Sequence, residues 1–248
     1  MEDYTIAESY ELPSKGLVYD KPVNPKIKIR SMTTEEEMKR LGHSERPNSL
    51  LAEIIDECLV EKPGISAYDL CIPDYQFLMY KLRIVTYGSK YTFSSICPIC
   101  GKPSEYTIDL EELPIKLYSE DLRSHLNITL PKTGKQIELR LQTPRILDDV
   151  AKKSKDLLSK SSDIKGEPAF LFNLISMINK VDGQVIDEFK LENFVRKLPM
   201  ADTNFILNNI KEVNFGLNTE INCTCKHCQA DYKSYLPITG EFFGPTFR

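Results

Sequence analysis

The chain has 248 residues, enough for one large domain or two small ones, and its 41% hydrophobic and 27% charged residues are typical of a globular protein. Its net charge of -4 argues against a dedicated nucleic-acid binder, for which a basic surface is expected. The N-terminal sequence lacks the basic and apolar regions of a signal peptide, and no apolar run approaches the roughly 18 residues of a membrane span, so we expect no membrane partner.

The first half of the chain predicts a turn, a strand and three helices. The sequence LPSKG at 12–16 predicts a turn, and the alternating residues 26–30 (KIKIR) predict a strand. Helices are expected at 35–41 with Thr33 or Thr34 as the N-cap, at 50–60 with Asn48 or Ser49 as the N-cap, and from Asp74 to a stop at Gly88.

The second half predicts the same succession of elements. A second turn, LPKTG at 130–134, precedes an alternating strand at 136–140. Helices are expected at 147–159, 170–181 and 191–197, and at 205–213 with Asp202 as the N-cap. The stretch 159–167, which is rich in Ser, Lys and Gly, predicts a flexible connection.

The two halves align with each other as copies of one unit. At an offset of 128 residues, Asp74 aligns with Asp202, Gly88 with Gly216, and one Cys-x-x-Cys pair with another. Chance similarity between two amphipathic helices is the alternative, but the order of turn, strand, helices, glycine and cysteines recurs as a whole. We therefore expect an α+β fold built from an internally duplicated unit. Its parts are residues 1–115, residues 116–240 and an aromatic tail at 241–248, and a shared metal joins them into one compact unit.

The Cys-x-x-Cys pairs predict one metal site. A closed structural zinc site needs four ligands, and each pair supplies two thiolates. Residues typical of strands flank both pairs, as in a zinc ribbon formed by two hairpins. The predicted ligands of a structural Zn²⁺ are Cys97, Cys100, Cys225 and Cys228. Iron in the same site and a redox-active dithiol are the alternatives.

The remaining cysteines and one histidine have less specific patterns. Cys223 forms a second pair with Cys225 and is a candidate to replace it, although the internal alignment favours Cys225. His227 lies inside the second pair, where the first has Ile99, so we expect it to be a solvent-facing residue or a hydrogen-bond partner of a thiolate. Cys58 and Cys71 lie in apolar stretches, so we expect their thiols to be buried in the core.

The usual catalytic motifs are missing from the sequence, so we expect no enzymatic activity. The lysines at 152–160 alternate with aspartates and predict a solvated helix face rather than a phosphate site. The aromatic residues at 87–93 predict core packing more strongly than a stacking platform. Phe242, Phe243 and Phe247 in the tail are suited equally to docking on a partner and to packing on the chain itself.

Taken in order, the segments LPSKG, IKIRSMTTEEE, CPICG, DLEELPIKLY, LPKTGKQIELR and CKHC resemble the baseplate hub and hub-assembly proteins of contractile-tailed phages of the T-even type. The resemblance extends from about Leu12 to Leu236. It implies a late structural or assembly protein that contacts other hub proteins, with the tape measure protein as a further candidate partner. It also implies assembly in the host cytoplasm and a place in the tail baseplate. A zinc-ribbon module that binds nucleic acid is the alternative, and the acidic composition argues against it.

Overall fold

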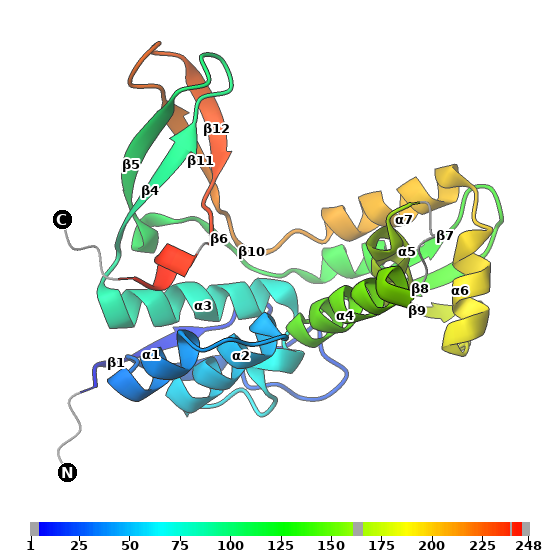
Figure 1. The fold of residues 1–248 in the computed structure, drawn as a ribbon. Coiled ribbons are helices and arrows are strands. Elements are labelled where there is room, and N and C mark those ends of the chain that lie inside the picture. The colour runs from blue at the N-terminus through cyan, green and yellow to red at the C-terminus, as the bar shows by residue number, and fades with distance from the viewer. Residues whose placement is uncertain (1–4, 161–165, 239, 245–248) are drawn as a thin grey trace.

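The computed structural model describes residues 5–160, 166–238 and 240–244. Helices and strands are mixed along the whole chain, so the predicted α+β class is confirmed. The two halves of the chain lie side by side, and a ribbon of four strands stands on the first of them (Figure 1). No helix among the described residues is long and apolar enough to cross a lipid bilayer.

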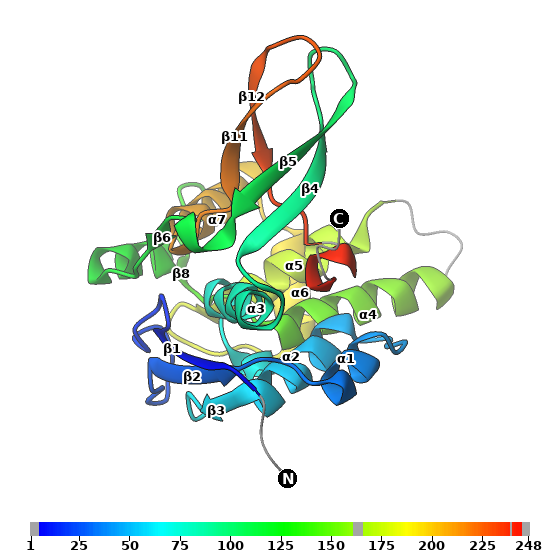
Figure 2. The same cartoon turned by 90° about the vertical axis from the view of Figure 1, so that its left-hand side faces the viewer.

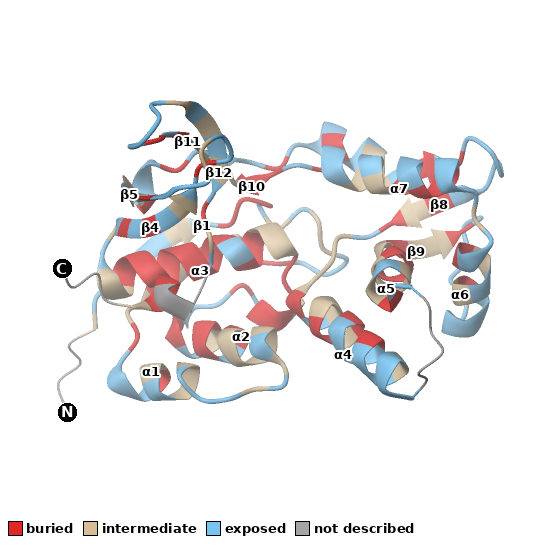
Figure 3. Cartoon of the chain, turned by 45° about the horizontal axis from the view of Figure 1, so that its top comes forward, coloured by how far each residue is buried: buried red, intermediate tan, exposed pale blue. Residues whose placement is uncertain are grey.

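The first half packs three helices against a small antiparallel sheet. The sheet has the order β1 (Ala7–Glu11), β2 (Lys26–Arg30), β3 (Leu59–Glu61). The helices are α1 (Thr34–Arg40), α2 (Pro47–Cys58) and α3 (Ile72–Tyr87). Helix α3 is buried along most of its length (Figure 3), since it contacts the sheet, α2 and the base of the ribbon. It is therefore the centre of the largest hydrophobic core.

The second half has a comparable arrangement. Its antiparallel sheet has the order β7 (Asn127–Thr129), β8 (Gln136–Leu139), β9 (Ile178–Val181). Four helices accompany it: α4 (Pro144–Lys160), α5 (Pro168–Met177), α6 (Glu188–Arg196) and α7 (Met200–Glu212). Their apolar residues form a core of their own, which includes Ile137, Leu174 and Ile206.

Each half holds its LPxxG turn with an aspartate from its last helix. Asp74 accepts hydrogen bonds from the backbone N–H of Ser14 at 3.0 Å and from its hydroxyl at 2.5 Å. Asp202 accepts them from the backbone N–H groups of Lys132 at 2.8 Å and Thr133 at 3.0 Å. In each sheet the pairing between the central strand and the third strand also shifts register, between Lys28 and Ile29 of β2 and between Glu138 and Leu139 of β8.

Several predicted boundaries are wrong for identifiable reasons. Helix α2 begins at Pro47, and neither Asn48 nor Ser49 caps it, because both donate hydrogen bonds to Asp148 of the second half. Asp202 likewise binds a turn instead of capping a helix. The apolar runs at 50–60 and 170–181 are each divided, with their last residues forming β3 and β9.

Other local predictions are confirmed. Helix α1 has Thr33 as its N-cap, in a capping box with Glu36. Lys152, Lys153 and Lys155 lie on the exposed face of α4. Residues 161–165, in the predicted flexible connection, lie outside the described residues.

Two short strands connect the halves. β6 (Ile115–Lys116), on the way into the second half, pairs with β10 (Gly216–Leu217), on the way out. Gly216 has a φ of +101°, and a Cβ atom there would lie 2.9 Å from Cβ of Pro73 at the start of α3. Glycine is therefore required where the returning chain crosses the first half.

The aromatic tail packs on the chain itself where it is described. Phe242 is fully buried and Phe243 nearly so, in the core of the first half. The ring centroid of Phe242 lies 4.8 Å from that of Tyr80 and 5.3 Å from that of Tyr91. Phe247 lies outside the described residues.

Candidate metal centre

The ribbon consists of two β-hairpins from distant parts of the sequence. The first hairpin pairs β4 (Lys90–Ile96) with β5 (Pro103–Asp109), and the second pairs β11 (Glu220–Thr224) with β12 (Asp231–Tyr235). The hairpins face each other along their length and their loops meet at the far end (Figure 2). Direct contacts include a hydrogen bond of 2.9 Å between the hydroxyls of Ser95 and Ser234.

The loop of the first hairpin is a compact turn around Cys97. The backbone N–H of Cys97 donates to Lys102 O at 3.0 Å, and that of Gly101 donates to Cys97 O at 2.9 Å. The backbone N–H of Ile99 points at Cys97 Sγ from 3.4 Å. Gly101 has a φ of +71°, which the turn requires. The turn thus directs the sulfurs of Cys97 and Cys100 and the backbone N–H of Ile99 toward the same region at the tip of the hairpin.

The loop of the second hairpin repeats this geometry around Cys225. Its backbone N–H donates to Ala230 O at 2.9 Å, and the backbone N–H of Gln229 donates to Cys225 O at 3.0 Å. The backbone N–H of His227 lies 3.4 Å from Cys225 Sγ. Gln229 takes the place of Gly101, with a φ of +60°. The same local turn therefore forms twice from different sequences.

The two loops bring four sulfur atoms together. The Sγ atoms of Cys97, Cys100, Cys225 and Cys228 all lie within 4.8 Å of one another. Cys97 Sγ is 3.7 Å from Cys228 Sγ, and Cys100 Sγ is 3.6 Å from Cys225 Sγ. A tetrahedral zinc ion with Zn–S bonds of about 2.3 Å separates its ligands by roughly 3.8 Å, whereas a disulfide needs roughly 2.05 Å. The spacing fits a shared ion and not a disulfide.

The electrostatics of the cluster also suit a cation. Backbone N–H groups of Cys228 and His227 lower the pKa of the Cys225 thiol to about 6. The Ala230 backbone N–H lowers the pKa of Cys228, but burial and the neighbouring sulfurs outweigh it and raise that pKa. Thiolates placed this close repel one another, and a divalent cation is the group that allows all four to ionise.

The other candidate residues lie outside the cluster. Cys223 is buried in the core of the first half, opposite Tyr232 in the second hairpin. The ring Nε2 of His227 donates to Pro103 O at 3.2 Å, which joins the second loop to the first hairpin. Cys58 and Cys71 are buried, as predicted. In the part of the chain that the structure describes, the four-cysteine group is the one cluster of metal-ligating side chains.

Residues 4–244 match a family model described as T4 bacteriophage base plate protein. The chain belongs to this family. It is accordingly a phage baseplate protein, a component of the virion tail that interacts with other phage structural proteins. No curated protein and no solved structure matches it.

Four thiolates leave no coordination position for water or substrate, so a metal held by these residues of the baseplate protein has a structural role. Because the ligands come in pairs from two hairpins, such an ion joins segments that lie before and after the sheet and helices of the second half. It would therefore act as a cross-link across the whole interposed segment.

The contacts that fix the ribbon of the baseplate protein to its base were not predicted from the sequence. The Arg83 side chain of α3 is fully buried, and its guanidinium donates to the carbonyls of Gly88 and, at 3.0 Å, of Lys90. Leu236 and Cys223 of the second hairpin enter the core beside α3. The position of Arg83 between the apolar residues Leu82 and Ile84 of α3 was the available signal, because a buried guanidinium needs acceptors nearby.

Proposed function

We propose that this baseplate protein is a structural or assembly component of the baseplate hub and acts through protein–protein contacts without catalysis. Its proposed partners are other hub proteins and the tape measure protein. It would meet them in the host cytoplasm during assembly. The family match supports the baseplate setting, and the resemblance of its CPICG and LPxxG segments to hub proteins supports the assignment to the hub.

The observation that carries the proposal is the convergence of the four sulfurs. We propose that Cys97, Cys100, Cys225 and Cys228 bind one structural Zn²⁺ and complete a zinc ribbon. The N–H groups directed at Cys97 and Cys225 would stabilise the charge of the complex. The ion would fix the ribbon as a rigid projection, so that the surfaces of both halves are presented to partners in a defined geometry.

The halves are proposed to be copies of one ancestral unit. Supporting observations are the matching order of elements, the aspartate that binds each LPxxG turn, and the repeated geometry of the cysteine loops. In this interpretation each copy supplies one half of the metal site. The proposed division of the chain, residues 1–115 and 116–240, follows from it.

Metal analysis combined with hub assembly tests this function. We expect one zinc per chain in the purified protein, with iron analysed in the same sample. Cys100→Ser should lose the metal, unfold the protein and abolish hub assembly when it replaces the natural protein during infection. A Cys100→Ser protein with normal metal content and normal assembly would contradict the proposal. Cys58→Ser, which changes a thiol far from the cluster, is the control for loss of a cysteine.

A further inference from the structure

Two arginines occupy equivalent positions in the two halves. Arg30 ends β2 and Arg140 follows β8, the central strands of the two sheets. Arg30 Nη2 donates to Glu57 O at 3.2 Å, and Arg140 Nε donates to Ser176 O at 2.7 Å. Each acceptor is the penultimate residue of the helix that leads into the third strand of its sheet. The two side chains therefore bind equivalent backbone carbonyls, although Arg30 is half-buried and Arg140 is exposed.

The carboxylate that neutralises Arg30 has no counterpart at Arg140. Glu36, six residues after Arg30, forms an ion pair with it at 2.6 Å and also closes the capping box of α1. The same spacing from Arg140 leads to Ile146, in the first turn of α4. Among the described residues Arg140 has no ion-pair partner, and partial desolvation without an acidic neighbour lowers its pKa, although the residue as a whole is exposed. A charge that is compensated in one half is uncompensated in the other.

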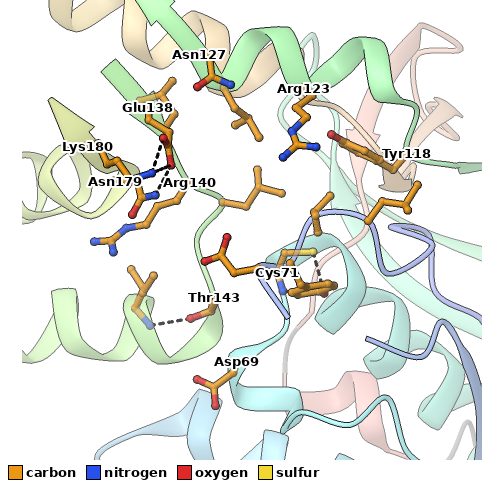
Figure 4. A pocket seen from close by; sticks show the side chains of 18 residues that line it. Asp69, Cys71, Tyr118, Arg123, Asn127, Glu138, Arg140, Thr143, Asn179 and Lys180 are labelled. Atoms are coloured by element: carbon orange, nitrogen blue, oxygen red, sulfur yellow. Dashed lines mark hydrogen bonds and ion pairs between the residues drawn. The ribbon is translucent and has the colours of Figure 1, made fainter. Parts of the chain in front are cut away.

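Arg140 lies where two cavities meet. A cleft of about 540 Å³ between the halves is lined by Tyr118 and Arg123 as well as by Arg140 (Figure 4). A smaller slot of about 270 Å³ lies beside α6 and contains apolar side chains such as Val185 and Leu191. Arg140, Ile146 and Asn179 line both cavities. We call the two together the Arg140 groove, and its size is that of an ordinary ligand site.

Most charges along the Arg140 groove are already paired. The acidic side chains with partners are Asp69 with Arg145 at 2.6 Å, Glu138 with Lys180 at 2.8 Å, Asp149 with Arg46 at 3.1 Å, and Glu188 with Lys153. In the described part of the chain this leaves two guanidiniums, Arg123 and Arg140, against one carboxylate, Asp20. Among the groups without an ion-pair contact, the polar end of the groove thus has one more cation than anions, and apolar side chains line the other end.

We infer that the Arg140 groove binds an extended acidic segment of another baseplate protein. A Glu or Asp of that segment pairs with Arg140, as Glu36 pairs with Arg30, and an adjacent apolar side chain enters the slot beside α6. Arg123 adds a second positive charge for the same or a neighbouring carboxylate. The identity of the partner as a baseplate protein rests on the proposed function, whereas the chemistry of its segment rests on the groove.

Binding to a peptide array tests the inference. Overlapping 15-residue peptides from the other baseplate proteins of the same phage are probed with the full-length protein, and affinities of selected peptides are measured by calorimetry. Peptides that bind should carry an acidic residue next to apolar ones. Replacing that Glu or Asp by its amide, or making Arg140→Gln in the protein, should each weaken binding about 10-fold or more. Arg196→Gln, which removes an exposed guanidinium paired with Glu192 on α6, should leave binding unchanged.

A second variant tests the comparison with Arg30 directly. Ile146→Glu places a carboxylate at the position that Glu36 has in the first half, so it should pair with Arg140 and exclude the acidic peptide. A melting temperature close to that of the natural protein shows that the variant is folded. If Arg140→Gln and folded Ile146→Glu bind the peptides as tightly as the natural protein, or if no acidic peptide binds, the inference is wrong.

Hub assembly separates the inference from the proposed function. Normal assembly with the Arg140→Gln protein would overturn the role of the groove and leave the proposed hub function standing. Absence of the natural protein from every hub intermediate during infection would instead overturn the hub function. Reduced assembly with Arg140→Gln and normal assembly with Arg196→Gln is the expected result.

Discussion

Replacing Cys225 by alanine should remove the proposed metal cross-link between the two hairpins of the ribbon. Cys100 and Cys225 are 125 residues apart in sequence, and their sulfurs are 3.6 Å apart. A metal that binds both closes a loop that contains the sheet β7–β8–β9 and helices α4 to α7 of the second half. By analogy with a disulfide that closes a loop of this length, such a cross-link lowers the conformational entropy of the unfolded chain and so stabilises the folded state by about 5 kcal/mol. Cys225→Ala should therefore lower the free energy of unfolding by about that amount.

Cys223→Ala is the matched control. Cys223 lies in β11, two residues before Cys225, and is also buried, but it lies outside the sulfur cluster. Its replacement should cost about 1 kcal/mol for the lost apolar contact and should leave the metal in place. Urea denaturation followed by circular dichroism gives the two free energies of unfolding, and mass spectrometry with plasma ionisation gives the metal content of each protein.

The difference between the two variants decides the question. Because proteins of ordinary stability have about 5–15 kcal/mol in total, the Cys225→Ala protein should lose between about a third and all of its stability. If it retains one metal ion per chain, or if its stability equals that of Cys223→Ala, the cluster does not clamp the fold. The reasoning from loop closure would then be refuted.

Three further predictions concern residues outside the cluster. Asp148→Asn should cost about 1–3 kcal/mol in thermal denaturation and speed hydrogen exchange at the start of α2, because the buried Asp148 carboxylate accepts hydrogen bonds from Asn48, Ser49 and Tyr68 of the first half. Burial raises the pKa of Glu36, but hydrogen bonds from Arg30 and Thr33 outweigh it and lower that pKa to about 2 from 4.5. This carboxylate therefore stabilises the protein by up to about 3 kcal/mol above pH 4.5, and the benefit is lost as the pH falls toward 2. In urea denaturation the gap between the natural protein and Glu36→Gln should accordingly be smaller at pH 3 than at pH 7, and an unchanged gap would contradict the assignment. Burial raises the pKa of Asp74, whereas for Asp202 hydrogen bonds from Lys132 and Thr133 overcome burial and lower the pKa. Asp202→Asn should therefore reduce the melting temperature at neutral pH more than Asp74→Asn, and the reverse order would exclude this explanation.

The parts of the fold that depend on local pattern were predictable from the sequence. The cysteine spacing and the strand-forming residues around it identified both hairpins, because a Cys-x-x-Cys turn and its flanking strands depend on a few neighbouring residues of the sequence. Aligning the halves also selected Cys225 over Cys223, and the structure places Cys225 in the cluster and Cys223 in the core. The mixed α+β class followed from the same local signals.

The parts that depend on long-range partners were not predictable. The run 170–181 is mostly apolar, so its periodicity does not reveal that its last four residues form a strand beside β8. In sequence Asp74 resembles the start of a helix and Asp202 a helix cap, and only the folded chain brings the LPxxG turns within reach of their carboxylates. The uncompensated Arg140 was equally hidden, because identifying it required knowing that Glu36 neutralises Arg30.

The contribution of the second hairpin to the core of the first half has a consequence for synthesis of the chain. Cys223, Leu236 and Phe242 complete the packing around α3, yet they follow the sheet and the helices of the second half in sequence. While the ribosome translates those elements, the apolar side of α3 and the sulfurs of Cys97 and Cys100 have no partners. A message truncated within the second half therefore yields a product that exposes apolar surface and becomes a target for chaperones and proteases. Translation past Cys228 is thus a condition for a product that can enter assembly.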